Sequence, residues 1–361
     1  MLDMLEAAVD TDADVTIATV QPTRDTAAFR QIRGLLDRLG LGVDDDIELF
    51  VTARDADGRL ISCLGLAGSV LKCAGCDPDA QGGGVLRRVM ERMNYEALDR
   101  GRGHLFAYTK PANRAIFESL GFSFLAEVPG VAVLLENTPF GLPRYLRDLS
   151  DLYLEGDRVG AVVLNANPFT LGHRYLVETA LGRVDALHVF VVSEDASLFP
   201  ARDRYHLVRA GVAELGSERV QVHRGGRYVV SRATFPNYFI KGGEERARAA
   251  AGLDLQLFRD FIGPTLGVTD RFVGTEPLSP VTNAYNAEMH HWLEDAPSAH
   301  PPIRVHEIER RTLGEAVISA SRVRACLESR DLAAIERMVP RPTYEYIKAN
   351  FFAEKSRTTK E

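Results

Sequence analysis

The chain has 361 residues, of which 45% are hydrophobic and 26% charged, with a formal net charge of -7. This length favours two domains, and the composition is that of an ordinary globular protein with enough apolar residues for two cores. The acidic balance argues against general nucleic-acid binding, which normally needs a basic face.

The sequence gives no sign of a membrane span or a secretory leader. The longest apolar candidate, residues 60–71, contains glycines and serines and is shorter than the ~18 residues that cross a bilayer. The N-terminus is acidic and lacks the basic start of a leader. Cys73 and Cys76 form one lone pair without suitably spaced histidines, which favours reduced buried thiols over a metal or redox site. We therefore expect a cytoplasmic protein.

The first part of the chain alternates strand and helix patterns. In chain order we expect a strand at 15–20, a helix at 25–39, strands at 48–53 and 60–74, a helix at 83–100, a strand at 104–109, a helix at 111–120 and a strand pair ending at 135. Turn residues over 137–143 then interrupt the pattern. The sequence thus predicts a first domain over 1–137 and a linker over 138–155.

From residue 156 strands and helices alternate regularly. Strand-like runs recur at 159–164, 186–192, 220–223, 270–273 and 303–307. This alternation predicts a Rossmann-like, doubly wound parallel sheet over a second domain, 156–354, with helices on both faces. Such sheets bind ligands beyond the carboxyl ends of their strands. The polar residues 355–361 predict a disordered tail.

A glycine-rich turn ends just before the predicted helix at 83–100. Its successive N–H groups can cradle a pyrophosphate, although such a turn is more often only a turn. Together with Asn113, at the start of the next helix, it resembles the signature segments of the Gcn5-related N-acetyltransferase fold. No general base is evident, so binding without acetyl transfer is at least as well supported. The resemblance assigns a CoA-like ligand to Gln81, Gly82, Gly84 and Asn113.

Segment 165–173, Asn-Ala-Asn-Pro-Phe-Thr-Leu-Gly-His, directly follows the strand-like run at 159–164. A strand that ends in a polar loop and then starts a helix offers unpaired N–H groups and a positive dipole end, which suit phosphate. Far downstream, segment 318–324, Ile-Ser-Ala-Ser-Arg-Val-Arg, predicts a second helix start with Ser319 as its cap.

Each segment alone is ordinary, since helix caps and structural histidines are common. Together, about 150 residues apart in this alternating pattern, they predict a site that cleaves a nucleoside triphosphate between its α and β phosphates. Such chemistry needs positioning and neutralisation of growing negative charge. Thr170 and His173 can donate hydrogen bonds to the α-phosphate, while Arg322 and Arg324 can grip the β and γ phosphates. The other residues expected to bind ATP are Asn165, Asn167, Phe169, Gly172, Glu276, Ser319 and Ser321. Lys241 either neutralises the triphosphate or is an exposed lysine.

The two segments resemble the motifs of the nucleotidylyltransferase superfamily, His/Thr-x-Gly-His and Ile-Ser-x-Ser-x-x-Arg. Longer strings, at 104–111, 165–178, 271–277 and 318–324, resemble the citrate lyase ligase family, over about residues 13–350. That family joins an acetyltransferase-like α+β domain to a Rossmann-like nucleotidylyltransferase domain, an α/β fold class. The resemblance implies an AMP-forming acid–thiol ligase. Such an enzyme makes acetyl-AMP from ATP and acetate and acetylates the thiol of the CoA-like prosthetic group on the acyl-carrier subunit of citrate lyase.

Two alternatives remain open. One is a nucleotidylyltransferase that makes a stable product, such as an adenylylated phosphate ester. The other is a CoA-dependent acetyltransferase or regulatory binder, against which the intact His173, Arg322 and Arg324 argue. Mg²⁺ is expected to be held by the triphosphate and water, with no protein metal cage. The expected partners are ATP, acetate and the carrier subunit, with no nucleic acid and no membrane.

Overall fold

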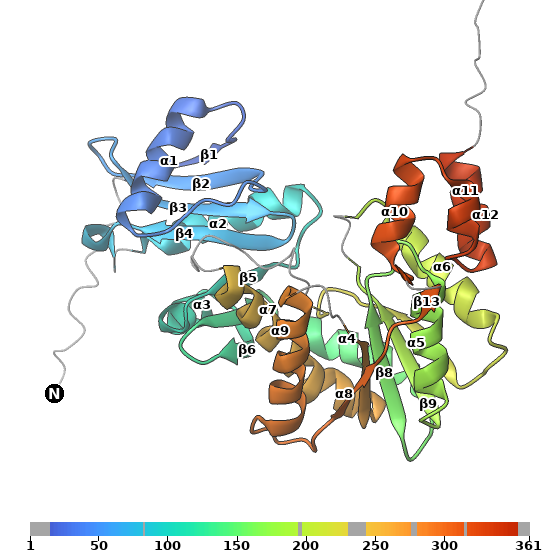
Figure 1. The fold of residues 1–361 in the computed structure, drawn as a ribbon. Helices are drawn as coiled ribbons and strands as arrows, with labels where there is room; N and C mark the ends of the chain where they lie inside the picture. Colours follow the sequence, from blue (N-terminus) through green and yellow to red (C-terminus); the bar gives the residue numbers. More distant parts are fainter. Residues whose placement is uncertain are drawn as a thin grey trace, which may run out of the picture. The chain divides into compact units, whose positions relative to one another are not determined.

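The structure is a computed structural model, and it describes residues 15–81, 84–193, 197–229, 243–275, 280–313 and 316–352, with the side chains of 280–284 and 316 left out. The chain divides into two compact units, Met1–Gly141 with Thr234–Ala249, and Leu142–Ala233 with Ala250–Glu361 (Figure 1). The predicted tail, 355–361, lies outside the described residues. In the described part of the chain, no helix is long and apolar enough to cross a membrane.

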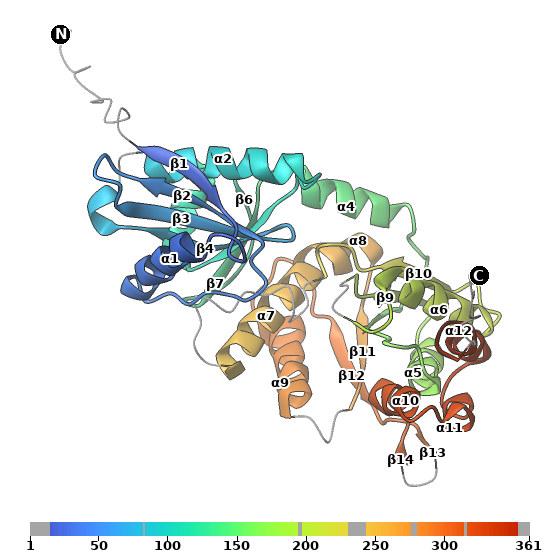
Figure 2. The same ribbon diagram turned by 90° about the horizontal axis from the view of Figure 1, so that it is seen from above.

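The N-terminal unit is built on a seven-stranded sheet in the order β1-β2-β3-β4-β5-β7-β6. Its elements are β1 (Thr16–Val20), α1 (Thr26–Arg38), β2 (Leu49–Arg54), β3 (Leu60–Ala67), β4 (Val70–Cys76), α2 (Val85–Asp99), β5 (Phe106–Thr109), α3 (Arg114–Ser119), β6 (Ser123–Val128) and β7 (Ala132–Glu136). The apolar face of α2 packs on one side of the sheet and that of α1 on the other (Figure 2). This is the acetyltransferase-like α+β fold expected from the sequence.

One pair of neighbouring strands in this sheet is parallel, and its two strands separate at one end. All neighbouring strands run antiparallel except β4 and β5, which pair through two registers, Val70 with Phe106 and Leu71 with Ala107. Both strands then continue beyond these pairs, β4 to Cys76 and β5 to Thr109, so they separate toward their carboxyl ends. The start of α2 lies at the same place, and the gap becomes a cavity.

The prediction of a single strand at 60–74 is wrong in one respect, because this segment forms a hairpin of two strands, β3 and β4. Gly68 has a φ of 57°, a left-handed conformation that glycine adopts without a steric penalty, and it allows the chain to reverse. β3 is buried along its whole length and β4 over most of its residues, so no polar alternation in the sequence marks the turn between them.

The second unit contains a five-stranded, all-parallel sheet in the order β10-β9-β8-β11-β12, which confirms the predicted doubly wound fold. Its elements are α4 (Gly141–Ser150), β8 (Val159–Leu164), α5 (Leu171–Leu181), β9 (Ala186–Val191), α6 (Ala201–Ala213), β10 (Val220–Arg224), α7 (Gly243–Leu257, of which the part from Ala250 belongs to this unit), α8 (Gly263–Leu266), β11 (Asp270–Gly274), α9 (Pro280–Met289), β12 (Arg304–Ile308), β13 (Thr312–Leu313), β14 (Ala316–Val317), α10 (Ala320–Glu328), α11 (Leu332–Glu336) and α12 (Arg341–Phe351). The five strands fall where the sequence predicts them, within about a residue.

Helices cover both faces of this sheet, as predicted. One core joins α5, α6 and α10–α12 to the sheet, and another joins α4, α7, α8 and α9 to its other face. The segment 138–155, predicted as a linker, therefore differs from expectation, because it contains α4, whose Leu149 is buried in the second core. Pro143 lies in the first turn of α4, where a missing N–H costs nothing.

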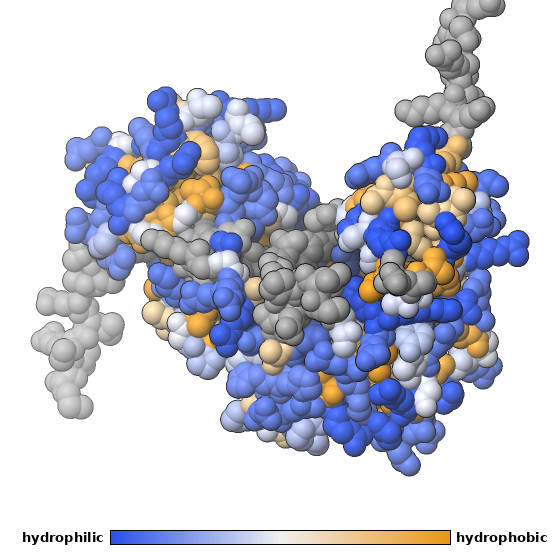
Figure 3. All heavy atoms as spheres, viewed as in Figure 1, coloured by the Kyte–Doolittle hydropathy of each residue, from blue (hydrophilic) through white to orange (hydrophobic). Residues whose placement is uncertain are grey.

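In the view of Figure 3 most of the surface is hydrophilic, and apolar residues gather over the region of α10–α12.

The strand order fixes where a ligand can bind. From β8 the sheet grows through β9 to β10 on one side, and through β11 to β12 on the other. Neighbouring connections therefore leave β8 and β11 in opposite directions, and a crevice opens beyond the carboxyl ends of these strands. Segment 165–173 follows β8 directly and enters this crevice.

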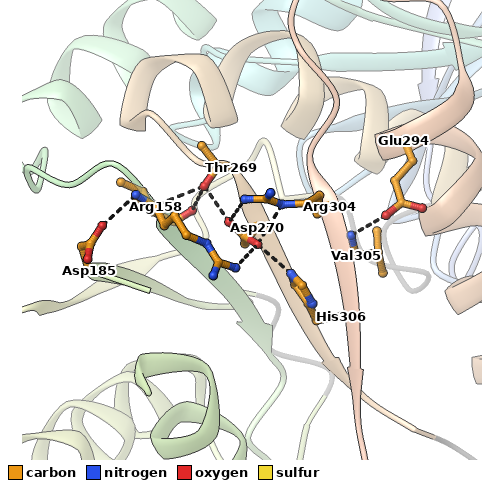
Figure 4. Close-up of polar contacts among 9 residues, drawn as sticks. Arg158, Asp185, Thr269, Asp270, Glu294, Arg304, Val305 and His306 are labelled. Atoms are coloured by element: carbon orange, nitrogen blue, oxygen red, sulfur yellow. Dashed lines mark hydrogen bonds and ion pairs between the residues drawn. The ribbon is translucent and has the colours of Figure 1, made fainter. Parts of the chain in front are cut away.

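The opposite, amino end of the sheet is tied together at Asp270, the first residue of β11 (Figure 4). Its carboxylate accepts hydrogen bonds from Arg158 (2.8 Å), from two nitrogens of Arg304 (3.2 and 3.0 Å), from His306 (2.6 Å) and from Thr269 (2.7 Å). Burial alone would raise the pKa of Asp270, but these hydrogen bonds outweigh burial and hold the pKa well below its usual value.

We expect Asp270→Asn to lower the free energy of unfolding by about 2 kcal/mol near neutral pH. Both arginines are about half exposed, so solvent screening keeps the loss modest. Because the folded-state pKa is lowered, this stabilisation is present above the ordinary carboxyl pKa and is lost as the pH falls below it. Urea unfolding of both proteins at several pH values measures the difference, which should shrink below about pH 4. Asp185→Asn, an exposed neighbour, is the control, and an equal loss in both variants would contradict the expectation.

Candidate functional site

A cavity of about 480 Å³ lies at the carboxyl ends of β8, β11 and β12. Two segments that are far apart in the sequence line it, the loop and first turn of α5 and the first turn of α10. The predicted residues in its lining are Asn165, Asn167, Thr170, Gly172, His173, Ser319, Ser321 and Arg324. Lys241 and Glu276 lie outside the described residues.

Thr170 caps α5 and holds His173 in one orientation. The Thr170 hydroxyl accepts a hydrogen bond from the backbone N–H of His173 (3.3 Å), and the Thr170 N–H donates to Nδ1 of the His173 ring (3.1 Å). Since Nδ1 accepts, the proton of the neutral ring is on Nε2. Thr170 is 1% exposed and belongs to the cavity lining, so the structure shows it positioning His173, and its own contact with a phosphate stays a prediction.

The His173 ring is uncharged at neutral pH. Burial, and to a smaller extent the positive charge of Arg310, lower its pKa to about 4. Phe169 stacks on the ring with centroids 5.8 Å apart, and it is fully buried outside the cavity lining. The structure therefore does not bring Phe169 into the cavity with the other residues predicted to bind ATP, and its ring packs against that of His173.

We expect the His173 ring to titrate near pH 4 in the free protein rather than near its usual value of about 6.5. Its charge then stays constant between about pH 6 and 8. The pH dependence of the activity in that range should therefore show no change caused by ionisation of this residue. NMR of the ring carbons, with His173→Gln to assign the signal, measures the pKa. A midpoint near 6.5 would show that the ring is open to solvent and that the neutral tautomer is not enforced.

Gly172 brings the two segments into contact. A β-carbon at this position would lie 2.9 Å from the backbone oxygen of Ile318, closer than real side chains approach. Ser319, the next residue, caps α10 by accepting a hydrogen bond from the N–H of Arg322 (3.2 Å). The absence of a side chain at Gly172 thus lets the starts of α5 and α10 face one cavity.

Arg324 links the same segments through its side chain. It donates to the backbone oxygen of Asn167 (2.6 Å) and to the hydroxyl of Ser321 (3.1 Å). Arg322 is exposed, donates to the backbone oxygen of Val317 (3.2 Å) and is not part of the cavity lining. Of the two predicted arginines, the structure therefore brings Arg324 into the cavity, because α10 turns Arg322 toward its outer side.

Arg204, on α6, was not predicted from the sequence. Its guanidinium is fully buried and donates to the backbone and side-chain oxygens of Asn165 (2.7 and 2.8 Å) and to the backbone oxygen of Phe199 (3.0 Å). Because the side-chain oxygen of Asn165 accepts from Arg204, its amide N–H₂ is the group that remains for the cavity. Asn167 is tied in a similar way, since its side-chain oxygen accepts from the N–H of Phe199 (3.1 Å).

The electrostatics of this cavity favour an anion. The N-termini of α5 and α10 both reach it, and each carries the positive end of a helix dipole. Among the described residues of the lining there are three arginines, Arg310, Arg311 and Arg324, and one carboxylate, Glu309. Neutral His173 adds an N–H donor, so the lining matches a group of phosphate oxygens.

A second cavity, of about 760 Å³, lies in the N-terminal unit where β4 and β5 separate. It brings together Gln81, Gly84 and Asn113, while Gly82 lies outside the described residues. Gly84 has a φ of 71° and precedes the first turn of α2, which suits a pyrophosphate cradle. Burial raises the pKa of the Cys76 thiol, which also lines the cavity, so this thiol stays protonated. Among the described lining residues there is no histidine and no carboxylate.

All four cysteines are free thiols. Within the described ranges, no group of three or more histidine, cysteine, aspartate or glutamate side chains could hold a metal ion.

Comparison with known proteins gives consistent matches over both units. Residues 159–347 match the family described as citrate lyase ligase C-terminal domain. The citrate (pro-3S)-lyase ligase of Escherichia coli is 44% identical over 317 residues, which cover 88% of this chain and 89% of that protein. The enzyme of the same name from Haemophilus influenzae is 40% identical over 316 residues, which cover 88% and 94%.

Solved structures match individual parts of the chain at lower identity. Thermotoga maritima TmcAL, bound with alpha-thio ATP, is 16% identical with a TM-score of 0.33 and covers 53% of this chain and 55% of that one. The length and identity of the sequence matches, together with the family domain, decide the assignment. The chain belongs to the citrate lyase ligase family.

Proposed function

We propose that the chain is an AMP-forming acid–thiol ligase, which activates acetate with ATP and acetylates the thiol of the CoA-like prosthetic group on the acyl-carrier subunit of citrate lyase. The observation that carries the proposal is the single anion-binding cavity shared by the Thr170–His173 turn and the start of α10. Membership of the citrate lyase ligase family supports the choice of reaction.

In the first step a carboxylate oxygen of acetate attacks the α-phosphorus of ATP, and the bond to the β-phosphate oxygen breaks. Pyrophosphate leaves and acetyl-AMP remains. Negative charge grows on the phosphate oxygens, and we propose that the Nε2–H of His173 donates to them; the hydrogen bond from Thr170 to Nδ1 supports this tautomer. Arg324 and the N-terminus of α10 supply positive charge for the departing phosphates.

In the second step the thiol sulfur attacks the acetyl carbonyl of acetyl-AMP. A thioester forms, the bond to the AMP oxygen breaks, and the thiol proton is released to solvent or a base. We propose that the cavity with Gln81, Gly84 and Asn113 binds the CoA-like arm that carries this thiol. The lack of a histidine or carboxylate in its described lining supports binding there without acetyl transfer.

The remaining parts of the proposal follow from the substrate. We expect Mg²⁺ to enter with ATP, coordinated by the triphosphate and water, and the described lining of the cavity supplies mainly arginines and helix N-termini, with the carboxylate of Glu309. ATP, acetate and a carrier protein are all intracellular, so we propose a cytoplasmic location. Gly82 remains a predicted contact of the CoA-like arm. Lys241 and Glu276 remain predicted contacts of the triphosphate.

The test is ATP–pyrophosphate exchange by the full chain with different acceptors. Acetate should drive exchange in the absence of a carrier, because acetyl-AMP formation is reversible while the product is bound. A phosphate ester should not drive exchange, and carrier with a free thiol should release AMP. Exchange with the phosphate ester but not with acetate would favour a nucleotidylyltransferase and reject the ligase.

A further inference from the structure

The turn that follows β8 has a backbone conformation that needs support. Ala166 has a φ of 50°, in the left-handed region that alanine adopts only at an energetic cost. It is buried in the cavity lining, between Asn165 and Asn167, two residues predicted to bind ATP. Such a conformation persists only where neighbouring contacts hold it. The contacts of this turn therefore decide the shape of the cavity at the end of β8.

Two arginines from other helices hold the residues on either side of Ala166. Nη1 of Arg204, on α6, donates to the backbone oxygen of Asn165 at 2.7 Å and to its side-chain oxygen at 2.8 Å. Nη1 of Arg324, on α10, donates to the backbone oxygen of Asn167 at 2.6 Å. The carbonyl groups of the residues before and after Ala166 are thus each fixed by a guanidinium.

Arg204 also connects the turn to the segment that follows β9. Its Nε donates to the backbone oxygen of Phe199 at 3.0 Å, and the N–H of Phe199 donates to the side-chain oxygen of Asn167 at 3.1 Å. One fully buried guanidinium is therefore linked to both asparagines. Because both side-chain oxygens accept hydrogen bonds within the protein, the asparagines can offer a ligand their N–H₂ groups, which are donors suited to phosphate oxygens.

Helix α6 supports the same segment a second time. A β-carbon at Gly211, about two turns after Arg204, would lie 2.6 Å from the ring of Phe169, so the helix packs directly on that ring. No residue of α6 belongs to the described lining of the cavity. The helix therefore supports the segment from outside the cavity.

We propose that Arg204 is a positioning residue of the adenylation site, which holds the Asn165–Asn167 turn in the conformation that lets the two asparagines donate to ATP. Arg204 acts through the asparagines and does not touch the substrate. The contact with ATP rests on the proposed function, whereas the hold of Arg204 on the turn does not.

The test compares Arg204→Lys, Ala166→Gly, the double variant and Val208→Ala in the full chain. Lysine keeps the positive charge, but its one nitrogen cannot occupy the positions of Nε and Nη1 together. Amide hydrogen exchange, followed by NMR without ligand, compares the N–H of Phe199 with that of Leu187, which donates to Arg219 within the sheet. Calorimetry measures the affinity for a non-hydrolysable ATP analogue.

We expect Arg204→Lys to speed the exchange of Phe199 about 10-fold relative to Leu187 and to weaken the ATP analogue about 10-fold. Adding Ala166→Gly should recover part of both losses and should improve binding more in Arg204→Lys than in the wild type, because glycine adopts the left-handed conformation without the cost. Val208, one turn after Arg204, is fully buried in the apolar core of α6. Val208→Ala should leave the affinity unchanged and should not speed Phe199 selectively.

The exchange of Phe199 separates this inference from the proposed function. If the wild type bound no ATP analogue, while Arg204→Lys still released Phe199 and glycine reversed the release, the hold on the turn would stand and the use of ATP would fail. Three results would overturn the role of Arg204. They are unchanged exchange of Phe199 in Arg204→Lys, wild-type affinity for the analogue despite a released turn, and an equal loss of affinity in Val208→Ala.

Discussion

Replacing His173 with alanine is expected to lower the ATP–pyrophosphate exchange rate by about 10²- to 10³-fold with little change in the KM for ATP. The ring is neutral and its Nδ1 accepts from Thr170, so Nε2–H is a fixed donor at the cavity. The proposed hydrogen bond to the α-phosphate would strengthen as charge grows there, so the loss is expected to fall on kcat. Steady-state exchange with acetate at saturating ATP measures the effect.

Two further variants make this prediction specific. His173→Gln keeps an N–H donor of similar reach and should retain more activity than alanine. His206→Ala removes an exposed histidine of α6 outside the cavity lining and should leave exchange unchanged. If alanine and glutamine at position 173 gave wild-type rates, the imidazole would have no part in the chemistry.

The strands and motif segments could be predicted because their signals are local. The second unit's strands are nearly continuous apolar runs between helical patterns, and each motif is a helix start with its cap in the sequence. The pattern could not separate β3 from β4, since both are buried and the turn at Gly68 interrupts no polar alternation.

Contacts between distant segments were beyond such local reasoning. Arg204 lies among the charged residues of α6, and nothing in its neighbours distinguishes a buried guanidinium from a solvated one. Arg310 follows an edge strand, where basic residues are usually exposed. Arg322 and Arg324 were both predicted to grip phosphates, and only the direction in which α10 starts distinguishes them.

Gly172→Ala is expected to reduce exchange by more than about 10²-fold and to lower the free energy of unfolding by about 1–3 kcal/mol. The new β-carbon would be 2.9 Å from the Ile318 backbone oxygen, and backbone cannot move aside as a flexible side chain can. The starts of α5 and α10 must separate, which displaces His173 from the start of α10. Exchange kinetics and urea unfolding measure the two effects.

Gly182→Ala, at the other end of α5, is the matched control. Its β-carbon would meet backbone oxygens at 3.6 Å, an ordinary contact, so stability should hold or rise slightly. Comparison of the two variants distinguishes an effect of the close contact between α5 and α10 from an effect of adding alanine to helix α5. Retention of full exchange activity by Gly172→Ala would mean that ATP is not held between these segments, and the adenylation site would have to lie elsewhere on the molecule.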